Sequence, residues 1–229
     1  MLSWSEIDTV MFDMDGTLLD LHFDNYFWED LVPTTYGQRH GLDKDQAWQK
    51  IMSQYRNMHG TLNWYCIDFW TETLQLDIQG MKEQWRHKIA IRANVQPMLE
   101  QLRDDGKKVL LVTNAHPGSL QLKMEHTGLE SHFDALYSSH NMGLAKEHEG
   151  FWKKLQTLEH YEPERTLLVD DTLPVLRRAQ LEGIRHLLAI EQPDSQRPPM
   201  QAAEFTQLRD FEQLLPLKPV AAKDRADTA

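Results

Sequence analysis

Short apolar segments, each bounded by turn residues or acids, constrain the fold of this chain more than any other feature of its sequence. Each has four to seven residues and is apolar on both faces rather than alternately apolar and polar. These segments span residues 9–12, 107–113, 135–138, 166–170 and 184–190. This pattern is typical of strands in a parallel sheet that is covered on both sides.

Helical patterns of apolar residues lie between the later strands, at residues 94–103, 117–127, 147–160 and 173–182. Alternation of strands and helices predicts an α/β fold with a doubly wound, Rossmann-like parallel sheet. We therefore expect residues 1–20 and 94–215 to form the core domain. The final segment, residues 216–229, has few large apolar residues, and we expect it to be a flexible tail.

Residues 21–93 interrupt this alternation. They contain no convincing strand and carry five of the seven tryptophans of the chain. Amphipathic stretches occur at residues 25–31, 43–57, 61–75 and 81–91. The segment is therefore predicted to be a helical subdomain inserted after the first strand.

Composition narrows the classes of protein that the chain can belong to. With 229 residues, it can bury a large core without disulfides or structural metals. Its single cysteine, Cys66, cannot form an internal disulfide, which favours a reducing compartment. The net charge of -11 argues against a nucleic acid polymer as partner, and no apolar run approaches the ~20 residues that span a bilayer. We expect a cytoplasmic globular protein.

The first strand ends in the sequence Asp13-Met14-Asp15-Gly16-Thr17. Residues i and i+2 of an extended chain point to the same side, so both carboxylates can face one site. Gly16 permits a tight turn directly after them. An acidic turn after a buried strand is the alternative reading of this motif taken alone.

Other polar residues follow the later predicted strands. Thr113 and Asn114 end the second strand, Lys146 follows a glycine-containing loop, and Asp170 and Asp171 end the fourth. Singly, the first pair are ordinary turn residues and a lone lysine is usually at the surface. Together they lie where ligands bind in open α/β sheets, and four acids with one lysine suit Mg²⁺ that bridges a phosphate.

The Asp-x-Asp-Gly-Thr element, a threonine that ends the second strand, a downstream lysine and a terminal acidic pair occur here in that order. In this respect the chain resembles the haloacid dehalogenase superfamily of phosphohydrolases, whose helical cap is placed just after the first motif. The resemblance implies that Asp13 is a nucleophile that forms an aspartyl-phosphate and that Asp15 is the general acid and base. Dehalogenases of the superfamily lack the second aspartate, so Asp15 argues against dehalogenation.

The resemblance also implies a cofactor and a phosphate site. Mg²⁺ would be coordinated by Asp13, the carbonyl of Asp15 and Asp171, with Asp170 binding it directly or through water. The phosphate would be held by Thr113 and Lys146, with assistance from Asn114. The family often has a small residue and a glycine soon after the acidic pair, whereas this chain continues Thr172-Leu173-Pro174-Val175. Proline is compatible with the first turn of a helix, so we expect altered local packing and an intact metal site.

Within the superfamily, the resemblance is closer to purine nucleotidases, and it is carried by residues 13–21, 23–28, 61–66, 113–117 and 125–129. It implies hydrolysis of GMP and IMP, small-molecule phosphate esters. The aromatic candidates for stacking on a purine are Phe27, Trp28, Trp64 and Tyr65; the candidates for bonding its edge are Asn25, Asn63 and His59. Of these, Asn25, Asn63 and Trp64 are the predicted substrate residues, although any of the set can instead belong to the core of the inserted segment.

Several alternatives remain at this stage. A phosphatase of small sugar phosphates or of phosphoglycolate and a phosphomutase would share the same core chemistry. A phosphorelay receiver is disfavoured because its acidic pair precedes its phosphoacceptor, and a non-catalytic scaffold is disfavoured because no member of the site is missing. The eleven histidines show no paired spacing of metal ligands, and we interpret them as residues of the surface or of the inserted segment.

Overall fold

The computed structural model describes residues 2–200 and 204–215; the predicted tail at 216–229 lies outside the described residues. Its centre is a six-stranded sheet in the order β3-β2-β1-β4-β5-β6, and all neighbouring strands are parallel. The strands are β1 Thr9–Phe12, β2 Lys108–Thr113, β3 Ala135–Ser138, β4 Thr166–Asp170, β5 His186–Ile190 and β6 Thr206–Leu208. The doubly wound α/β fold is confirmed.

The five predicted strands are all present, and β2 and β5 begin one and two residues later than predicted. The sixth strand, β6, was not predicted. It has three residues, two of them exposed, at the edge of the sheet. A strand with one buried residue has no apolar run by which it could be recognised.

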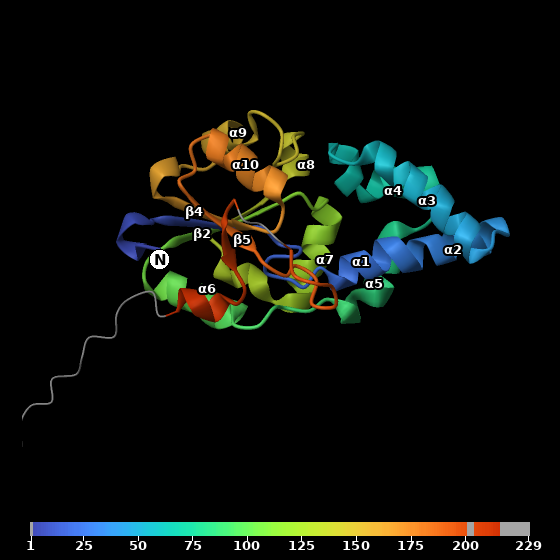
Figure 1. The fold of residues 1–229 in the computed structure, drawn as a ribbon, viewed down its shortest axis with the longest axis horizontal. Coiled ribbons are helices and arrows are strands. Elements are labelled where there is room, and N and C mark those ends of the chain that lie inside the picture. The colour runs from blue at the N-terminus through green and yellow to red at the C-terminus, as the bar shows by residue number, and fades with distance from the viewer. Residues whose placement is uncertain (1, 201–203, 216–229) are drawn as a thin grey trace, which may run out of the picture.

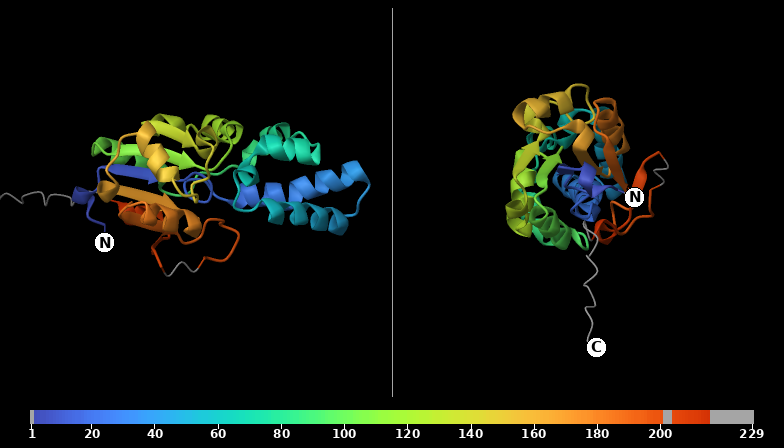
Figure 2. Two further views of the ribbon diagram at one scale, coloured as in Figure 1. Left: turned by 90° about the horizontal axis from the view of Figure 1, so that it is seen from above. Right: turned by 90° about the vertical axis from the view of Figure 1, so that its left-hand side faces the viewer.

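Helices cover both faces of the sheet (Figure 2). Val10 and Phe12 of β1 face a cluster that contains Leu99 of helix α6 (Val95–Asp104), whereas Met11 faces a cluster that contains Leu155 of helix α9 (Phe151–Leu158). All four residues of β1 are buried. The central strands β1 and β4 are buried throughout because helices cover the sheet on both faces.

The predicted core helices are confirmed with small changes of length. Helices α7 (Pro117–Thr127) and α10 (Leu173–Leu181) have almost the predicted bounds. Helix α9 is shorter than the prediction of 147–160, because Gly150 has a φ of 84° and the helix begins only after it. A short helix α8, Ser139–Met142, follows β3 and was not predicted.

Residues 22–88 form helices and no strand, and Figure 1 shows α1 to α4 extending beyond the sheet. The helices are α1 His22–Tyr26, α2 Val32–His40, α3 Lys44–Met58, α4 Ile67–Leu74 and α5 Ile78–Trp85. A π-helical segment, Phe27–Leu31, joins α1 to α2, which was not predicted. The predicted helix at 61–75 is interrupted at Cys66, which caps α4. No helix of the described residues is long and apolar enough to cross a membrane.

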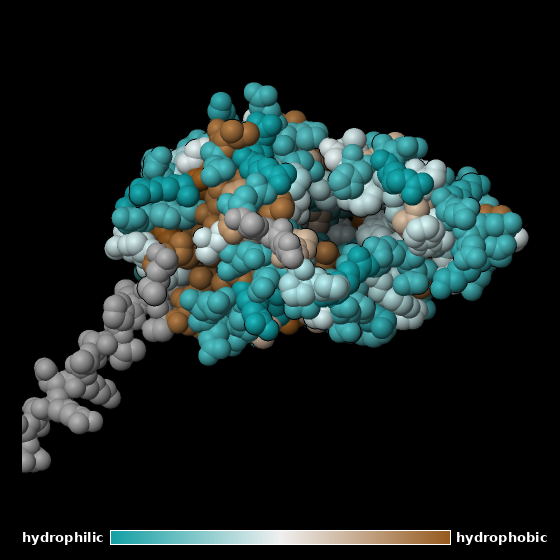
Figure 3. Space-filling view, viewed as in Figure 1, coloured by the Kyte–Doolittle hydropathy of each residue, from teal (hydrophilic) through white to brown (hydrophobic). Residues whose placement is uncertain are grey.

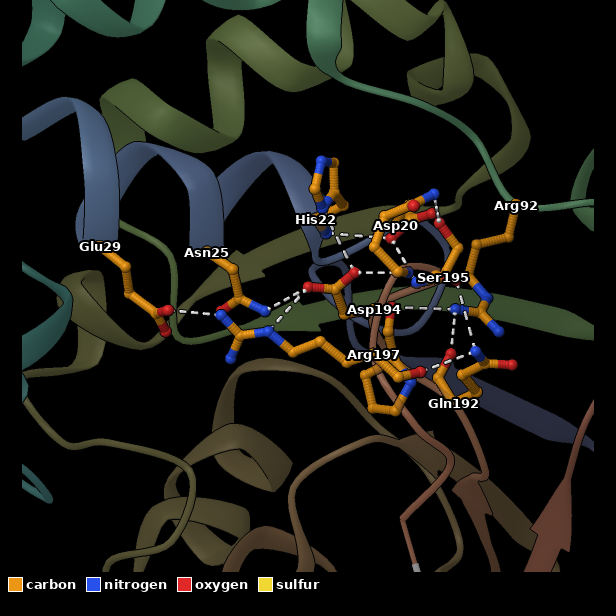
Figure 4. A network of polar contacts seen from close by, with 11 residues as sticks. Asp20, His22, Asn25, Glu29, Arg92, Gln192, Asp194, Ser195 and Arg197 are labelled. Carbon is orange, nitrogen blue, oxygen red and sulfur yellow. Dashed lines mark hydrogen bonds and ion pairs between the residues drawn. The ribbon is translucent and has the colours of Figure 1, made fainter.

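Both ends of the inserted segment are bound by the loop that follows β5 (Figure 4). At one end, Asp20 Oδ1 accepts a hydrogen bond from the Ser195 amide at 3.1 Å. At the other end, Arg92 Nη1 donates to the carbonyl oxygens of Gln192 and Pro193 at 2.7 and 3.0 Å. One loop thus holds together the two points where the chain leaves and re-enters the sheet-bearing part.

Candidate active site

Three adjacent parallel strands place the first polar residues of the site side by side. Asp13 follows β1 directly, and its amide donates to the carbonyl of Val169 in β4 at 3.0 Å. Thr113 and Asp170 are the last residues of β2 and β4, the two neighbours of β1 in the sheet. The sheet order therefore brings together residues that are about 60 to 160 positions apart in the chain.

Lys146 lies at the centre of this group and is 1% exposed. Its Nζ donates to Asp13 Oδ1 at 2.5 Å, to Asp170 Oδ2 at 2.7 Å and to the Val112 carbonyl at 3.0 Å. Burial alone would lower the pKa of this ammonium group, but Asp13 and Asp170 outweigh burial and raise it. Lys146 is therefore a buried cation of the site and not a surface lysine.

The turn after β1 packs directly on the second acidic pair. Gly16 has a φ of +82°, and a Cβ atom on it would lie 2.5 Å from Asp171 Oδ2. Asp170 Oδ1 accepts a hydrogen bond from the Thr172 amide at 2.8 Å. Pro174 lies in the first turn of α10, as predicted. Glycine is required at position 16 both by the backbone conformation and by the proximity of Asp171.

Asp13, Asp170 and Asp171 form a cluster of carboxylates, with one oxygen of each within 4.8 Å of the others. Burial, together with Asp170, raises the pKa of Asp13 to about 6 against the opposing effect of Lys146. Burial also raises the pKa of Asp171, and Asp13 and Asp170 raise it further. Crowded carboxylates of this kind are the oxygen ligands that suit a small divalent cation such as Mg²⁺.

Asp15 belongs to a separate buried chain of charges that joins the sheet-bearing part to the inserted segment. Lys123 Nζ of α7 lies 2.6 Å from Asp15 Oδ1 and 2.6 Å from Asp24 Oδ2 of α1. Lys82 Nζ of α5 lies 3.0 Å from the other oxygen of Asp24. Burial and the charge of Asp24 raise the pKa of Asp15 to about 6, against the effect of Lys123.

Lys82, Lys123 and Asp24 were missed by the sequence analysis, although the two lysines carry a signal that could have identified them. Lys123 follows Leu122 on the buried face of α7, and Lys82 is four residues from the buried Ile78 on α5. A charged residue on the apolar face of a helix is buried and needs a partner of opposite charge. The partner itself could not be read from the sequence.

Asn114 is held by protein groups on both sides of its amide. Its Oδ1 accepts a hydrogen bond from the Lys146 amide, and its Nδ2 donates to Glu147 Oε2, both at 2.9 Å. The hydroxyl of Tyr65 donates to the other oxygen of Glu147 at 3.0 Å. The side chain of Asn114 therefore positions the loop that carries Lys146. Glu147 and its contact with Tyr65 were not predicted.

A cavity of about 890 Å³ lies between the sheet edge and the inserted helices, and Figure 3 shows the surface hollowed between these two parts. Its polar end is lined by Asp13, Asp15, Thr113, Asn114, Lys146 and Asp171. The aromatic residues of its lining are Trp28, Trp48, Tyr55, Trp64, Tyr65 and Trp70. Asp170 is fully buried behind this lining and reaches the site through Lys146.

The predicted substrate residues have different positions. Trp64 lines the cavity, and its ring meets that of Tyr55 at a centroid distance of 5.6 Å and an angle of 87°. Asn25 also lines the cavity, but its amide donates to Asp194 Oδ2 at 2.7 Å (Figure 4). Asn63 is exposed and is absent from the described lining of the cavity. Of the three predicted substrate residues, Trp64 lies in the cavity, Asn25 lies there but is bonded to Asp194, and Asn63 lies outside the described lining.

This fold and site define a class of protein. Residues 7–177 match the haloacid dehalogenase-like hydrolase family, and the chain belongs to that family. The chain is 42% identical over 215 residues to the GMP/IMP nucleotidase YrfG of Escherichia coli (strain K12) and to that of Shigella flexneri, with coverage of 94% of this chain and 97% of each relative. The expected enzyme class, a phosphoric monoester hydrolase, is thereby confirmed.

Solved structures share the fold at lower sequence identity. A HAD phosphatase from Thermococcus onnurineus superimposes with a TM-score of 0.76 at 23% identity, covering 91% of this chain and 96% of the other. A predicted phosphoglycolate phosphatase from Haemophilus somnus superimposes with a TM-score of 0.67 at 15% identity, covering 93% and 98%. At these identities the likeness concerns the fold alone.

Proposed function

We propose that this protein is a Mg²⁺-dependent phosphatase that hydrolyses the purine nucleoside 5′-monophosphates GMP and IMP through an aspartyl-phosphate at Asp13. The observation that carries the proposal is the position of Asp13. Its carboxylate contacts Lys146 at 2.5 Å and lines a cavity whose lining also includes six aromatic residues. The names of the two relatives at 42% identity support the substrate.

The acidic cluster fits the metal that the family implies. Asp13 and Asp171 would hold Mg²⁺ together with the carbonyl of Asp15, and Asp170 would do so directly or through water. Each of the three clustered carboxylates offers an oxygen within 4.8 Å of the others, and their repulsion favours a cation between them. When bound, Mg²⁺ neutralises charge on the phosphate and on the attacking carboxylate.

The residues of the chain supply the remaining chemistry. A carboxylate oxygen of Asp13 forms a bond to phosphorus as the bond from phosphorus to the ester oxygen breaks, and Asp15 gives a proton to the leaving alkoxide. Asp15 then takes a proton from the water that cleaves the acyl phosphate, which returns Asp13 to its carboxylate form. Lys146 and Thr113 hold the phosphate and offset its charge.

We infer that residues 21–93 act as a cap over a core formed by 1–20 and 94–215. The contacts of Asp24 with Lys123 support this division, because they connect the first helix of the inserted segment to the general acid. A cap that covers the phosphate end of the cavity would exclude water and contact the leaving group.

Tyr55 is our candidate for the residue that recognises the purine base by a hydrogen bond. It lines the cavity, and its hydroxyl is buried with no hydrogen-bond partner among the described residues. A purine edge would supply that partner, while the rings of Trp28 and Trp64 offer faces for stacking. Tyr55→Phe should raise KM for GMP and IMP by about 10-fold, because one hydrogen bond to the base is lost. The matched control is Tyr36→Phe, because Tyr36 is also buried but does not belong to the described lining of the cavity.

The test of the proposed function is release of inorganic phosphate from a panel of esters, with and without Mg²⁺. The panel contains GMP, IMP, CMP, UMP, phosphoglycolate and sugar phosphates. We expect GMP and IMP to have the highest kcat/KM and all activity to require the metal. Equal rates on every ester would reject the purine claim, and preference for phosphoglycolate or a sugar phosphate would replace it. Transfer of the phosphoryl group to a second hydroxyl instead of water would identify a phosphomutase.

A further inference from the structure

A second cluster of possible metal ligands lies outside the acidic site. Cys66, His116 and His140 each offer one ligand atom, and these atoms lie within 4.8 Å of one another. Cys66 immediately precedes α4, His116 immediately precedes α7, and His140 lies in α8. The cluster therefore joins the inserted segment to the sheet-bearing part. His116 and His140, interpreted from the sequence as residues of the surface or of the inserted segment, lie outside residues 21–93 and are partly buried.

The two imidazoles are partly buried and pack edge to face. Their ring centroids are 5.0 Å apart at an angle of 74°. Nε2 of His140 is buried and makes no close hydrogen bond among the described residues, while the backbones of Asn114 and Tyr65 lie near the imidazole and favour its charged form. Burial, and then the neighbouring His116, lowers the pKa of His140 to about 4. His140 is therefore neutral at pH 7, which is the form of imidazole that binds a metal.

The other two members have contacts that restrain their side chains. Cys66 Sγ accepts a hydrogen bond from the Phe69 amide at 3.4 Å. His116 Nδ1 accepts one from the Gly118 amide at 3.2 Å, and its Nε2 lies 3.4 Å from Asp68 Oδ2. Metal binding through Nε2 of His116 would replace its contact with Asp68 and place the ring proton on Nδ1, so the hydrogen bond from Gly118 would be lost; Asp68 would then be available as a further ligand.

We propose that Cys66, His116 and His140 bind one Zn²⁺ ion, or a divalent ion of similar ligand preference, that bridges the inserted segment and the core. A thiolate with two imidazoles is a ligand set that zinc prefers, whereas Mg²⁺ prefers oxygen. Ligands of a tetrahedral zinc lie about 3.5 Å apart, so the ligand atoms, now within 4.8 Å of one another, would have to close by no more than about 1.3 Å. This site is chemically distinct from the cluster of Asp13, Asp170 and Asp171.

Such a bridge would restrain residues that line the cavity, among them Tyr65, Asn114 and His116. Tyr65, next to Cys66, donates to Glu147, which in turn holds Asn114, two residues before His116. An ion that ties Cys66 to the two histidines would fix these contacts and slow the movement of the inserted segment. This regulatory consequence rests on the proposed function, whereas binding of the ion does not.

Binding is tested on the full chain without turnover. Co²⁺ and Zn²⁺ are titrated in the presence of millimolar Mg²⁺, which occupies oxygen sites. We expect one equivalent of Co²⁺ to produce the near-ultraviolet absorption of a cysteinate–cobalt bond, and Zn²⁺ to remove it by displacement. Cys66→Ser should abolish this absorption, and His140→Ala should weaken Zn²⁺ binding by 100-fold or more.

The control variant is His126→Ala, which removes an exposed imidazole from the same helix that His116 precedes. It should bind both ions as the unchanged protein does. The proposal would be overturned if the unchanged protein lacked the cobalt–thiolate absorption. It would also be overturned if Cys66→Ser and His140→Ala bound Zn²⁺ with the same affinity as the unchanged protein. Circular dichroism and urea unfolding of each variant separate loss of ligands from loss of fold.

A second measurement addresses the consequence for turnover. At saturating Mg²⁺, stoichiometric Zn²⁺ should lower kcat on GMP at least 5-fold in the unchanged protein and leave Cys66→Ser unaffected. Inhibition that persists equally in Cys66→Ser would place the inhibiting zinc elsewhere and reject the regulatory role. If no ester is hydrolysed under any condition, the proposed function fails, but the cobalt spectrum still decides the metal site.

Discussion

The ammonium group of Lys123 lies 2.6 Å from a carboxylate oxygen of Asp15, which is partly exposed to the cavity. Lys123 is 1% exposed and is shared with Asp24 of the inserted segment. The residue to which we assign the role of general acid is therefore positioned by a lysine of the core, whose other partner belongs to the inserted helices. This relationship gives Lys123 a positioning role that can be tested.

Lys123→Met should lower kcat on GMP by about 10- to 100-fold, because the general acid loses the cation that orients it. KM should change little. On p-nitrophenyl phosphate, whose leaving group needs no proton, the deficit in kcat/KM should largely disappear, because this ratio reports formation of the aspartyl-phosphate and not its hydrolysis, in which Asp15 acts as base. Steady-state kinetics on the two substrates measures this difference.

Lys82→Met is the matched control for Lys123→Met. Lys82 is equally buried in the same chain of charges but contacts Asp24 and not Asp15. Both variants should lose about 3–5 kcal/mol of unfolding free energy, because each removes a buried cation: Lys123→Met leaves Asp15 without its lysine, and Lys82→Met leaves Asp24 with one lysine instead of two. If Lys82→Met also lost much more activity on GMP than on p-nitrophenyl phosphate, the specific role of Lys123 would be contradicted.

Asp13→Asn should lower kcat by at least about 10⁴-fold, because an amide cannot replace the attacking carboxylate. Rapid-quench turnover with labelled substrate should detect phosphate bound covalently to the unchanged protein and none bound to the variant. Asp8→Asn, which alters an exposed aspartate before β1, should retain both activity and labelling. Covalent labelling of Asp13→Asn at the normal rate would remove Asp13 from the role of nucleophile.

Gly16→Ala should weaken the apparent affinity for Mg²⁺ by about 10-fold or more, because its Cβ would displace Asp171 Oδ2, which lies 2.5 Å from the Cβ position. Gly60→Ala is matched for backbone strain: its φ is +78° against +82°, and nothing lies within 4 Å of its Cβ position. Gly60→Ala should lose about 1 kcal/mol of stability, and Gly16→Ala should lose more because of the added contact with Asp171. Mg²⁺ titration of activity checks the difference, and equal Mg²⁺ affinities would show that the contact with Asp171 is unimportant.

Asp24 should make folding depend on pH in the acid range. Burial opposes ionisation of this carboxyl, but Lys123 and Lys82 outweigh burial and lower its pKa to about 2. A lowered pKa in the folded state stabilises the protein above about pH 4, and that stability is lost as the pH falls towards 2. The unchanged protein should have a higher unfolding free energy than Asp24→Asn at pH 5. Urea unfolding should show that this difference decreases by about 2 kcal/mol between pH 5 and pH 2. A difference that stays constant with pH would contradict the assignment.

The sheet and its catalytic edge could be predicted because local patterns determine them. Apolar runs mark strands that are covered on both faces, as in β1 and β4, and the acids that end those runs must lie at one edge of a parallel sheet. Asp13, Asp15, Thr113, Lys146 and Asp171 accordingly line one cavity. Edge strand β6 was missed because only one of its residues is buried.

Partners that come from distant segments could not be predicted. The sequence by itself determined the α/β architecture, the family and the motif residues, since these depend on periodicity and on order along the chain. Only the tertiary structure decided that Lys123 pairs with Asp15, that Asn25 is bound to Asp194, and that Cys66 lies beside His116 and His140. The physical reason is that a side-chain contact depends on how helices pack across the sheet edge, and no local pattern encodes the distance between residues that packing brings together.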